Sequence, residues 1–344
     1  MTQHHDEATP PITAQEASQL AQDVLFQVRR AVVGADAALE MVLAGILAGG
    51  HVLLEDLPGL GKTLAARSFA QALGLPFTRA QFTPDLLPAD LTGSYVYEQA
   101  RGEFIFRKGP VFTGLLLADE INRTPPKTQS ALLEAMQERQ VTVEGTTMPL
   151  PSPFHVLATS NPVEHEGTYP LPEAQLDRFL LRLSFGYPTP DQEWDVLARR
   201  IQRRQEEQSV DQVLSPGRLL ALQQACEDVH VAEDVGRYAV AIVSETRRHQ
   251  QVLIGASPRG SLALLTCARA LAVIRGRDFV VPEDIVALAH PALEHRITVR
   301  PELWLQDVTA RDIIGSVVHS VPVPDAPAQD DPAEDDPVPG TPQR

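Results

Sequence analysis

The segment HVLLEDLPGLGKTLAARSFAQALG, residues 51–74, decides the fold. Its first six residues form a continuous apolar run closed by Pro58 and Gly59, and residues 62–74 have helical spacing and end on a glycine. This order predicts a strand, a loop and a helix. Further strand-like runs, separated by helix-like text such as residues 126–139, follow at 77–82, 115–119, 154–159 and 179–185. Such alternation predicts an α/β fold in which a parallel sheet carries helices on both faces.

The loop of this segment, DLPGLGKT (56–63), has the second half of the phosphate-loop pattern G-x-x-x-x-G-K-[ST], with Asp56 in place of the first glycine. Small residues let backbone N–H groups surround phosphates, the Lys62 amine reaches the outer phosphates, and the Thr63 hydroxyl holds Mg²⁺. A bare GKT also occurs at ordinary helix starts, but its place between a strand and a helix favours nucleotide binding. The residues expected to contact the nucleotide here are Pro58, Gly59, Leu60, Gly61, Lys62, Thr63 and Leu64.

Two adjacent acids, Asp119 and Glu120, stand at the end of the apolar run at 115–119. A strand end exposed to solvent would tolerate such a pair without any function. Together with a phosphate loop 56 residues earlier, however, the pair indicates a magnesium site. Asp119 would support the metal through water, and Glu120 would act as general base toward the attacking water.

Three further polar residues are candidates for catalysis. Asn161 lies just after the strand-like run at 154–159 and either holds the attacking water or forms a turn before Pro162. Arg178 and Arg259 stand at the end of one helix-like segment and the start of another. A guanidinium on the outer phosphate stabilises the transition state, whereas most single arginines only form surface ion pairs. We expect Lys62, Arg178 and Arg259 to form one cationic pocket around the nucleotide.

The chain divides into four parts. Thr13 and Glu16 fit a capping box that starts a helix running to about Arg30. Residues 96–107 and 140–150 each read as an inserted hairpin. From Pro190 the strand signal ends, and helices are predicted at about 191–206, 215–229, 232–249, 258–275 and 282–295. The predicted parts are a disordered leader (1–12), an α/β nucleotide-binding core (13–189), a smaller α-helical domain (190–320) and a disordered tail (321–344).

The composition excludes several classes of protein. The chain of 344 residues has 29 Lys+Arg and 45 Asp+Glu, a formal charge of −16, which argues against a basic coat on nucleic acid. The proline-rich tail accounts for −5 of this charge, since it has six acids and one arginine. Cys226 and Cys267 read as buried thiols of a reducing cytoplasm. No signal peptide is visible, and the longest weakly charged stretch (41–54) is too short to cross a bilayer, so a cytoplasmic protein without a transmembrane segment is expected.

Six blocks of the sequence, in order and spacing, match one known family. They are HVLLEDLPGLGKT, QFTPDLLPADLTG, GEFIFRKGPVF, LLLADEINRTPPKTQSALLEAMQERQVTVEG, LATSNPVEHEGTYPLPEAQLDRF and GASPRGSLALL. On these blocks the sequence resembles the MoxR family of AAA+ ATPases across residues 12–320. The run from the acidic pair to the glutamine-rich helix and the block EGTYPLPEAQLDRF are specific to that family. Members commonly have Asp or Gly at the position of Asp56.

The resemblance implies an AAA+ P-loop NTPase core, with a helix 2 insert at 96–107 and a pre-sensor 1 hairpin at 140–150, followed by an all-α lid. It places the adenine near Val33 and Gly34, before the first strand. It also assigns catalytic roles: Lys62 and Thr63 form the Walker A pair, Asp119 and Glu120 the Walker B pair, Asn161 is sensor 1, Arg178 the arginine finger and Arg259 the sensor 2 arginine.

The resemblance further implies a ring, usually of six subunits, because an arginine finger must reach the nucleotide of a neighbour. Work on proteins is expected: ATP and Mg²⁺ would drive remodelling or activation of a client, often with a von Willebrand factor A domain partner, for instance in metal insertion or cofactor maturation. Nucleic acid is not an expected partner, since neither hairpin is strongly basic. Two alternatives stay open, a ring motor acting on DNA and a nucleotide-gated scaffold with little turnover.

Overall fold

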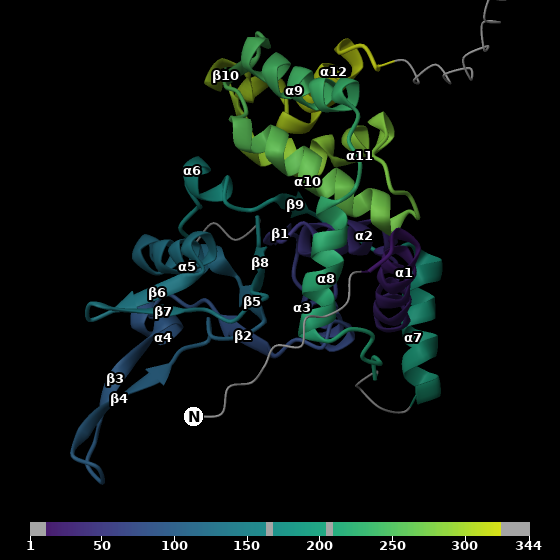
Figure 1. The fold of residues 1–344 in the computed structure, drawn as a ribbon. Helices are drawn as coiled ribbons and strands as arrows, with labels where there is room; N and C mark the ends of the chain where they lie inside the picture. The colour runs from purple at the N-terminus through teal and green to yellow at the C-terminus, as the bar shows by residue number, and fades with distance from the viewer. Residues whose placement is uncertain (1–11, 163–167, 204–208, 325–344) are drawn as a thin grey trace, which may run out of the picture.

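The computed structural model describes residues 12–162, 168–203 and 209–324 (Figure 1). The predicted leader and tail lie outside these ranges, apart from residue 12 and residues 321–324. Among the described helices, none is both long and apolar enough to cross a membrane.

A five-stranded parallel sheet forms the centre of the N-terminal part, in the order β2-β5-β8-β1-β9. The strands β1, β5 and β8 are largely buried on both faces, as the apolar runs predicted, whereas the edge strand β2 is partly exposed. Because all five strands are parallel, their carboxyl ends meet at one edge of the sheet. The strands are β1 (Val52–Glu55), β2 (Phe77–Gln81), β5 (Leu115–Asp119), β8 (His155–Ser160) and β9 (Leu181–Leu183).

Helices cover both faces of this sheet. The side chains of β1 alternate, so that Val52 and Leu54 join the apolar cluster of α1, α2 and α3, whereas Leu53 joins the cluster of α4 and α5. The prediction of a parallel sheet between helices is therefore confirmed. The helices of this part are α1 (Ala14–Ala31), α2 (Asp36–Leu47), α3 (Lys62–Ala72), α4 (Pro88–Thr92), α5 (Pro126–Glu138) and α6 (Glu173–Leu176), with a short 3₁₀ turn η1 (Ile121–Arg123).

Both predicted hairpins are present. The first, β3 (Gly93–Glu98) with β4 (Glu103–Lys108), projects away from the body of the molecule (Figure 1). The second, β6 (Gln140–Val143) with β7 (Thr146–Pro149), follows α5 directly. Each hairpin turns at a glycine with positive φ, Gly102 and Gly145, where other residues rarely fit.

The C-terminal part is mainly helical and shares a continuous apolar cluster with α1, α2 and α3. It has one helix more than the sequence predicted, at its end. It also contains a two-stranded antiparallel sheet of β10 (Val252–Ile254) and β11 (Thr298–Val299), which differs from the expected all-α lid. The helices are α7 (Pro190–Arg203), α8 (Pro216–Glu227), α9 (Glu233–Arg248), α10 (Pro258–Ile274), α11 (Pro282–Leu293) and α12 (Ala310–Ser320), with 3₁₀ turns η2 (Glu294–Arg296) and η3 (Pro301–Gln306).

Candidate nucleotide site

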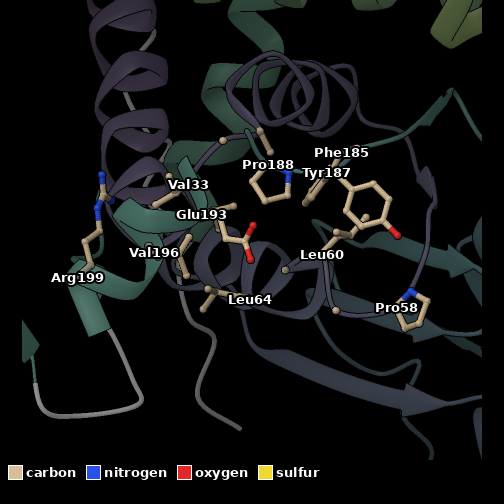
Figure 2. A pocket seen from close by; sticks show the side chains of 17 residues that line it. Val33, Pro58, Leu60, Leu64, Phe185, Tyr187, Pro188, Glu193, Val196 and Arg199 are labelled. Carbon is tan, nitrogen blue, oxygen red and sulfur yellow. The ribbon is translucent and has the colours of Figure 1, made fainter. Parts of the chain in front are cut away.

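Two cavities meet at the loop between β1 and α3, and both are lined by Pro58, Gly59, Gly61 and Leu64. One has a volume of about 390 Å³ and polar walls; the other, of about 440 Å³, is drawn in Figure 2. The polar walls come from residues that the sequence singled out, Lys62, Thr63, Asp119, Glu120 and Asn161, together with Arg79, Thr159 and Ser160.

The loop has the geometry of an anion cradle. Gly59 and Gly61 have φ of 86° and 83°, and a Cβ at either position would meet open space, so glycine is required by the backbone and leaves room for a ligand. Gly61 caps α3 without a side-chain hydrogen bond, so the N–H groups of the first helical turn stay available to an anion. Lys62 begins that helix, and its Nζ donates to the backbone oxygen of Asp56 at 2.6 Å.

Burial lowers the pKa of Lys62, and the nearby carboxylates of Asp56, Asp119 and Glu120 oppose this shift. The lysine is therefore a partly desolvated amine facing acidic groups. Bound phosphates would add negative charge and favour its protonated form further.

Asp119 is held firmly at the end of β5. Its Oδ1 accepts a hydrogen bond from Thr159 Oγ1 at 2.6 Å, and its Oδ2 accepts from Arg79 Nη2 at 2.6 Å and Nε at 2.9 Å. The carboxylate is thus fixed between the neighbouring strands β8 and β2. A metal ion at Thr63 would meet this carboxylate beside the Arg79 guanidinium, which fits support through water better than direct ligation.

Glu120 has an unusual backbone conformation, with φ 58° and ψ 50° in the left-handed region. Its N–H donates to Thr159 Oγ1 at 2.8 Å, which stabilises this turn. Its carboxylate lines the polar cavity, where Oε2 accepts from Gln81 Nε2 at 2.6 Å and Arg123 Nη1 at 2.9 Å. A strained glutamate held by several partners at a cavity is typical of a functional position.

Asn161 is buried at the end of β8 and lines the same polar cavity. Its backbone oxygen accepts a hydrogen bond from Asn122 Nδ2 at 3.1 Å, which ties the β8 end to the turn after Glu120. The structure therefore brings Lys62, Thr63, Asp119, Glu120 and Asn161 together.

Arg178 and Arg259 lie elsewhere, in a cavity of about 330 Å³ that also contains Asp177, Arg296 and His51. His51 precedes β1, whereas the phosphate loop follows it, so this cavity is at the opposite edge of the sheet. Arg178 lies there because it precedes β9, which runs parallel to β1. Within one chain, therefore, Lys62 does not share a cavity with Arg178 and Arg259, and the expected cationic pocket is not formed by a single chain.

The second cavity at the loop has walls from three segments: residues 31–35, the linker 185–188 between β9 and α7, and α7 itself (Figure 2). Val33 and Gly34 are among them, as the resemblance implied. Arg199 Nη1 of α7 donates to the backbone oxygens of Arg29 at 3.3 Å and Arg30 at 3.1 Å, which holds α7 against α1. This cavity has the apolar surfaces and the position to receive a base whose phosphates lie on the loop.

Sequence reasoning missed Arg79, Gln81, Thr159 and the linker 185–188. Arg79 and Gln81 alternate along β2, so they point to one face, and the register pairs Gln81 with Asp119. The available signal was that two polar residues, two positions apart in a strand of the sheet, place their side chains on the same face. The described residues contain no group of three or more His, Cys, Asp and Glu side chains able to hold a metal alone. A Mg²⁺ ion here would depend on Thr63, water and the phosphates of its nucleotide, as is common for this ion.

This fold and site define an AAA+ ATPase. Residues 51–181 match the family described as ATPase family associated with various cellular activities (AAA), and residues 244–317 match the AAA lid domain. A solved structure of a candidate ATPase from Cytophaga hutchinsonii superposes with a TM-score of 0.85 and 41% identity, covering 91% of this chain and 97% of that one.

Curated relatives narrow the class. Chaperone MoxR1 of Mycobacterium tuberculosis is 45% identical over 309 residues, which cover 87% of this chain and 81% of that protein. The uncharacterized protein YeaC of Bacillus subtilis is 48% identical over 297 residues, 86% of this chain and 92% of that protein. The chain belongs to the MoxR family of AAA+ ATPases.

Proposed function

We propose that this chain hydrolyses ATP with Mg²⁺ at the polar cavity beside the phosphate loop. One observation carries the proposal: the ends of β1, β5 and β8 bring a lysine, a threonine, two carboxylates and an amide to one cavity. An amine and free helix N–H groups suit phosphates, while a general base and an amide suit an attacking water.

Each residue has a definite task in this reaction. The loop N–H groups and Lys62 hold the β- and γ-phosphates. Thr63 directly, and Asp119 through water, would hold Mg²⁺, which would neutralise phosphate charge. Asn161 orients the water, and Glu120 accepts its proton as the water oxygen bonds to the γ-phosphorus and the bond to the ADP oxygen breaks. Glu120 must turn from Gln81 and Arg123 toward the water to do so.

We further propose that Arg178 acts on the nucleotide of a neighbouring subunit, within a ring of six. Its separation from the phosphate loop of its own chain supports this assignment, because an arginine at the opposite edge of the sheet cannot reach those phosphates. Arg259 lies in the same cavity and acts with it across the interface.

The work of this ring is the remodelling or activation of client proteins in the cytoplasm. The chaperone description of a relative supports this role. The buried free thiols of Cys226 and Cys267, whose pKa values burial raises to about 12, support a reducing compartment. A von Willebrand factor A domain partner and metal or cofactor insertion belong to the proposal as its finer part.

A DNA motor is less favoured. The projecting β3–β4 hairpin carries Arg101 paired with Glu98 at 3.5 Å and Glu103 at 4.0 Å, which leaves mixed charge where phosphates would bind. A scaffold with little turnover does not account for the positioned Glu120.

Phosphate release by the wild-type protein, with and without Mg²⁺, tests the ATPase. Capture from lysate with a Glu120→Gln protein, which should stall on its target, tests the client. Magnesium-dependent release and recovery of a protein client are expected; release at background would contradict the ATPase, and recovery of DNA alone would favour the motor.

A further inference from the structure

Asp56 stands where the phosphate-loop pattern has its first glycine, and the reaction described above gives its carboxylate no task. The residue is 7% exposed, so a carboxylate is buried at the start of the loop. Burying an ionised carboxylate is costly unless hydrogen bonds compensate for lost water. Its partners therefore indicate what it does.

Among the residues that the structure describes, the hydrogen-bond donors to this carboxylate lie in the linker between β9 and α7. Ser184 Oγ donates to Oδ1 at 2.7 Å, the backbone N–H of Phe185 donates to Oδ2, and that of Gly186 donates to Oδ1 at 3.4 Å. Gly186 has φ 69°, so the turn that presents these N–H groups requires a glycine.

The same linker lines the second cavity at the loop, of about 440 Å³, which is suited to the nucleotide base and is called the base cavity. Phe185, Gly186, Tyr187 and Pro188 line it together with Leu60 and Leu64 of the loop and helix (Figure 2). The backbone of Asp56 meanwhile belongs to the phosphate site, since its carbonyl oxygen accepts from Lys62 Nζ at 2.6 Å. One residue is therefore bonded to the phosphate-binding lysine and to the wall of the base cavity.

We propose that Asp56 is a positioning residue that fixes the linker 184–188 against the phosphate loop and so sets the base cavity. The proposal rests on the proposed binding of ATP at this loop. Without the carboxylate, two backbone N–H groups and a hydroxyl lose their acceptor, and the linker loses its fixed position relative to the loop. The phosphate cradle itself keeps Gly59, Gly61 and the start of α3.

The test compares two ligands that differ in the base and ribose. Equilibrium affinities of ATP and of inorganic tripolyphosphate, each with Mg²⁺, are measured for wild type and Asp56→Gly, the residue of the generic pattern. We expect ATP affinity to fall by about tenfold or more, as for a lost charge-assisted hydrogen bond, while tripolyphosphate affinity stays within about twofold.

Controls separate this role from general damage. Ser184→Ala removes one of the three donors and should lower ATP affinity by a smaller factor, again without lowering tripolyphosphate affinity. This variant keeps the test possible if Asp56→Gly fails to fold. Arg182→Gln breaks the ion pair between Arg182 of β9 and Glu55 of β1, the strands that precede the linker and Asp56, but leaves the linker contacts intact. The ratio of ATP affinity to tripolyphosphate affinity should therefore match wild type.

Equal losses for ATP and tripolyphosphate, or no loss in Asp56→Gly and Ser184→Ala, would overturn the inference. Absence of ATP binding in the wild-type protein would instead overturn the proposed function, so the two failures are distinguishable.

Discussion

Thr159 is the residue that joins the two acids of the site. It is buried on β8, and its hydroxyl donates to Asp119 and accepts from the N–H of Glu120, at 2.6 and 2.8 Å. The hydroxyl thus supports both the carboxylate that we propose to hold the metal and the strained turn of the proposed general base.

Thr159→Val keeps the shape of the side chain and removes the hydroxyl. Loss of a hydrogen bond to a charged group costs about 1.5–3 kcal/mol, so we expect hydrolysis to fall about tenfold to a hundredfold. ATP affinity should change little, since Lys62 and the loop are untouched. Phosphate release and ATP titration check this, with Thr159→Ser restoring activity; a valine variant as fast as wild type would contradict it.

Motif spacing was sufficient to predict that five residues lie at one cavity, because each stands at or just after the end of an apolar run that forms a strand. These residues are Lys62, Thr63, Asp119, Glu120 and Asn161. Arg79 and Gln81 could not be assigned, since their role depends on the pairing of β2 with β5. Spacing along the chain does not determine which strands become neighbours.

At the scale of elements, two buried histidines lie at the edge of the sheet away from the phosphate loop. Burial lowers the pKa of His51 to about 3 and of His155 to about 4. His51 accepts from the N–H of Val156 at 3.0 Å, and His155 bonds Gly50 O at 3.0 Å, so both are packed as neutral rings.

These histidines make stability depend on pH. An unfolded histidine binds a proton near pH 6.5, well above the folded values, so the unfolded state holds more protons between about pH 6.5 and 4. The free energy of unfolding should therefore decrease as the pH is lowered, by up to about 1.4 kcal/mol per pH unit for each histidine.

Urea unfolding of wild type and His155→Gln from about pH 7.5 to 5 checks the sign, because the carboxylates shared by both proteins cancel. The advantage of wild type should shrink as pH falls. A difference that is constant with pH would contradict the neutral buried ring.

Arg296 links η2 to the segment before β9. Its side chain is 2% exposed, its Nε donates to Asp177 Oδ1 at 2.7 Å, and its guanidinium also donates to the backbone oxygens of Phe179 at 2.8 Å and Leu180 at 3.1 Å. It joins the helical part to the strand-bearing part at the cavity of Arg178.

Arg296→Met should lower the free energy of unfolding by about 3–5 kcal/mol, as when one partner of a buried pair is removed. Arg237→Met is the matched control, because its pair with Glu233 is 76% exposed on both sides. That variant should change stability by less than about 1 kcal/mol. Similar urea midpoints for the two variants would contradict the role of Arg296.

The strands of the parallel sheet, α5 and both hairpins were predictable because their patterns are regular, but α2 and α12 were not. Helix α2 (DAALEMVLAGIL) is apolar on nearly all sides because it is buried between α1 and α10, so it lacks amphipathic spacing. Helix α12 is rich in β-branched residues that favour strands, and the capping box of Thr309 and Asp312 with packing on α9 and α11 overrides that preference.

At the scale of the whole molecule, the two edges of the sheet carry two halves of one proposed catalytic centre. The phosphate loop is at one edge, and Arg178 with Arg259 is at the other. A ring in which these edges face each other would complete the centre at every interface.

Arg178→Ala should therefore lose hydrolysis by about 10³-fold or more, the usual effect of an arginine finger, while ATP affinity of isolated monomers stays near wild type. Phosphate release at concentrations that favour assembly checks the expected loss of hydrolysis. ATP titration under dilute conditions checks that monomer affinity is retained. Strong loss of monomer affinity would contradict action in a neighbouring subunit.

The central claim is that Glu120 is the general base of an ATPase, and phosphate release paired with ATP binding in Glu120→Gln tests it most directly. The amide keeps the size of the side chain but cannot accept the water proton. The account predicts ATP affinity close to wild type with hydrolysis abolished. A Glu120→Gln protein that releases phosphate as fast as wild type would contradict it.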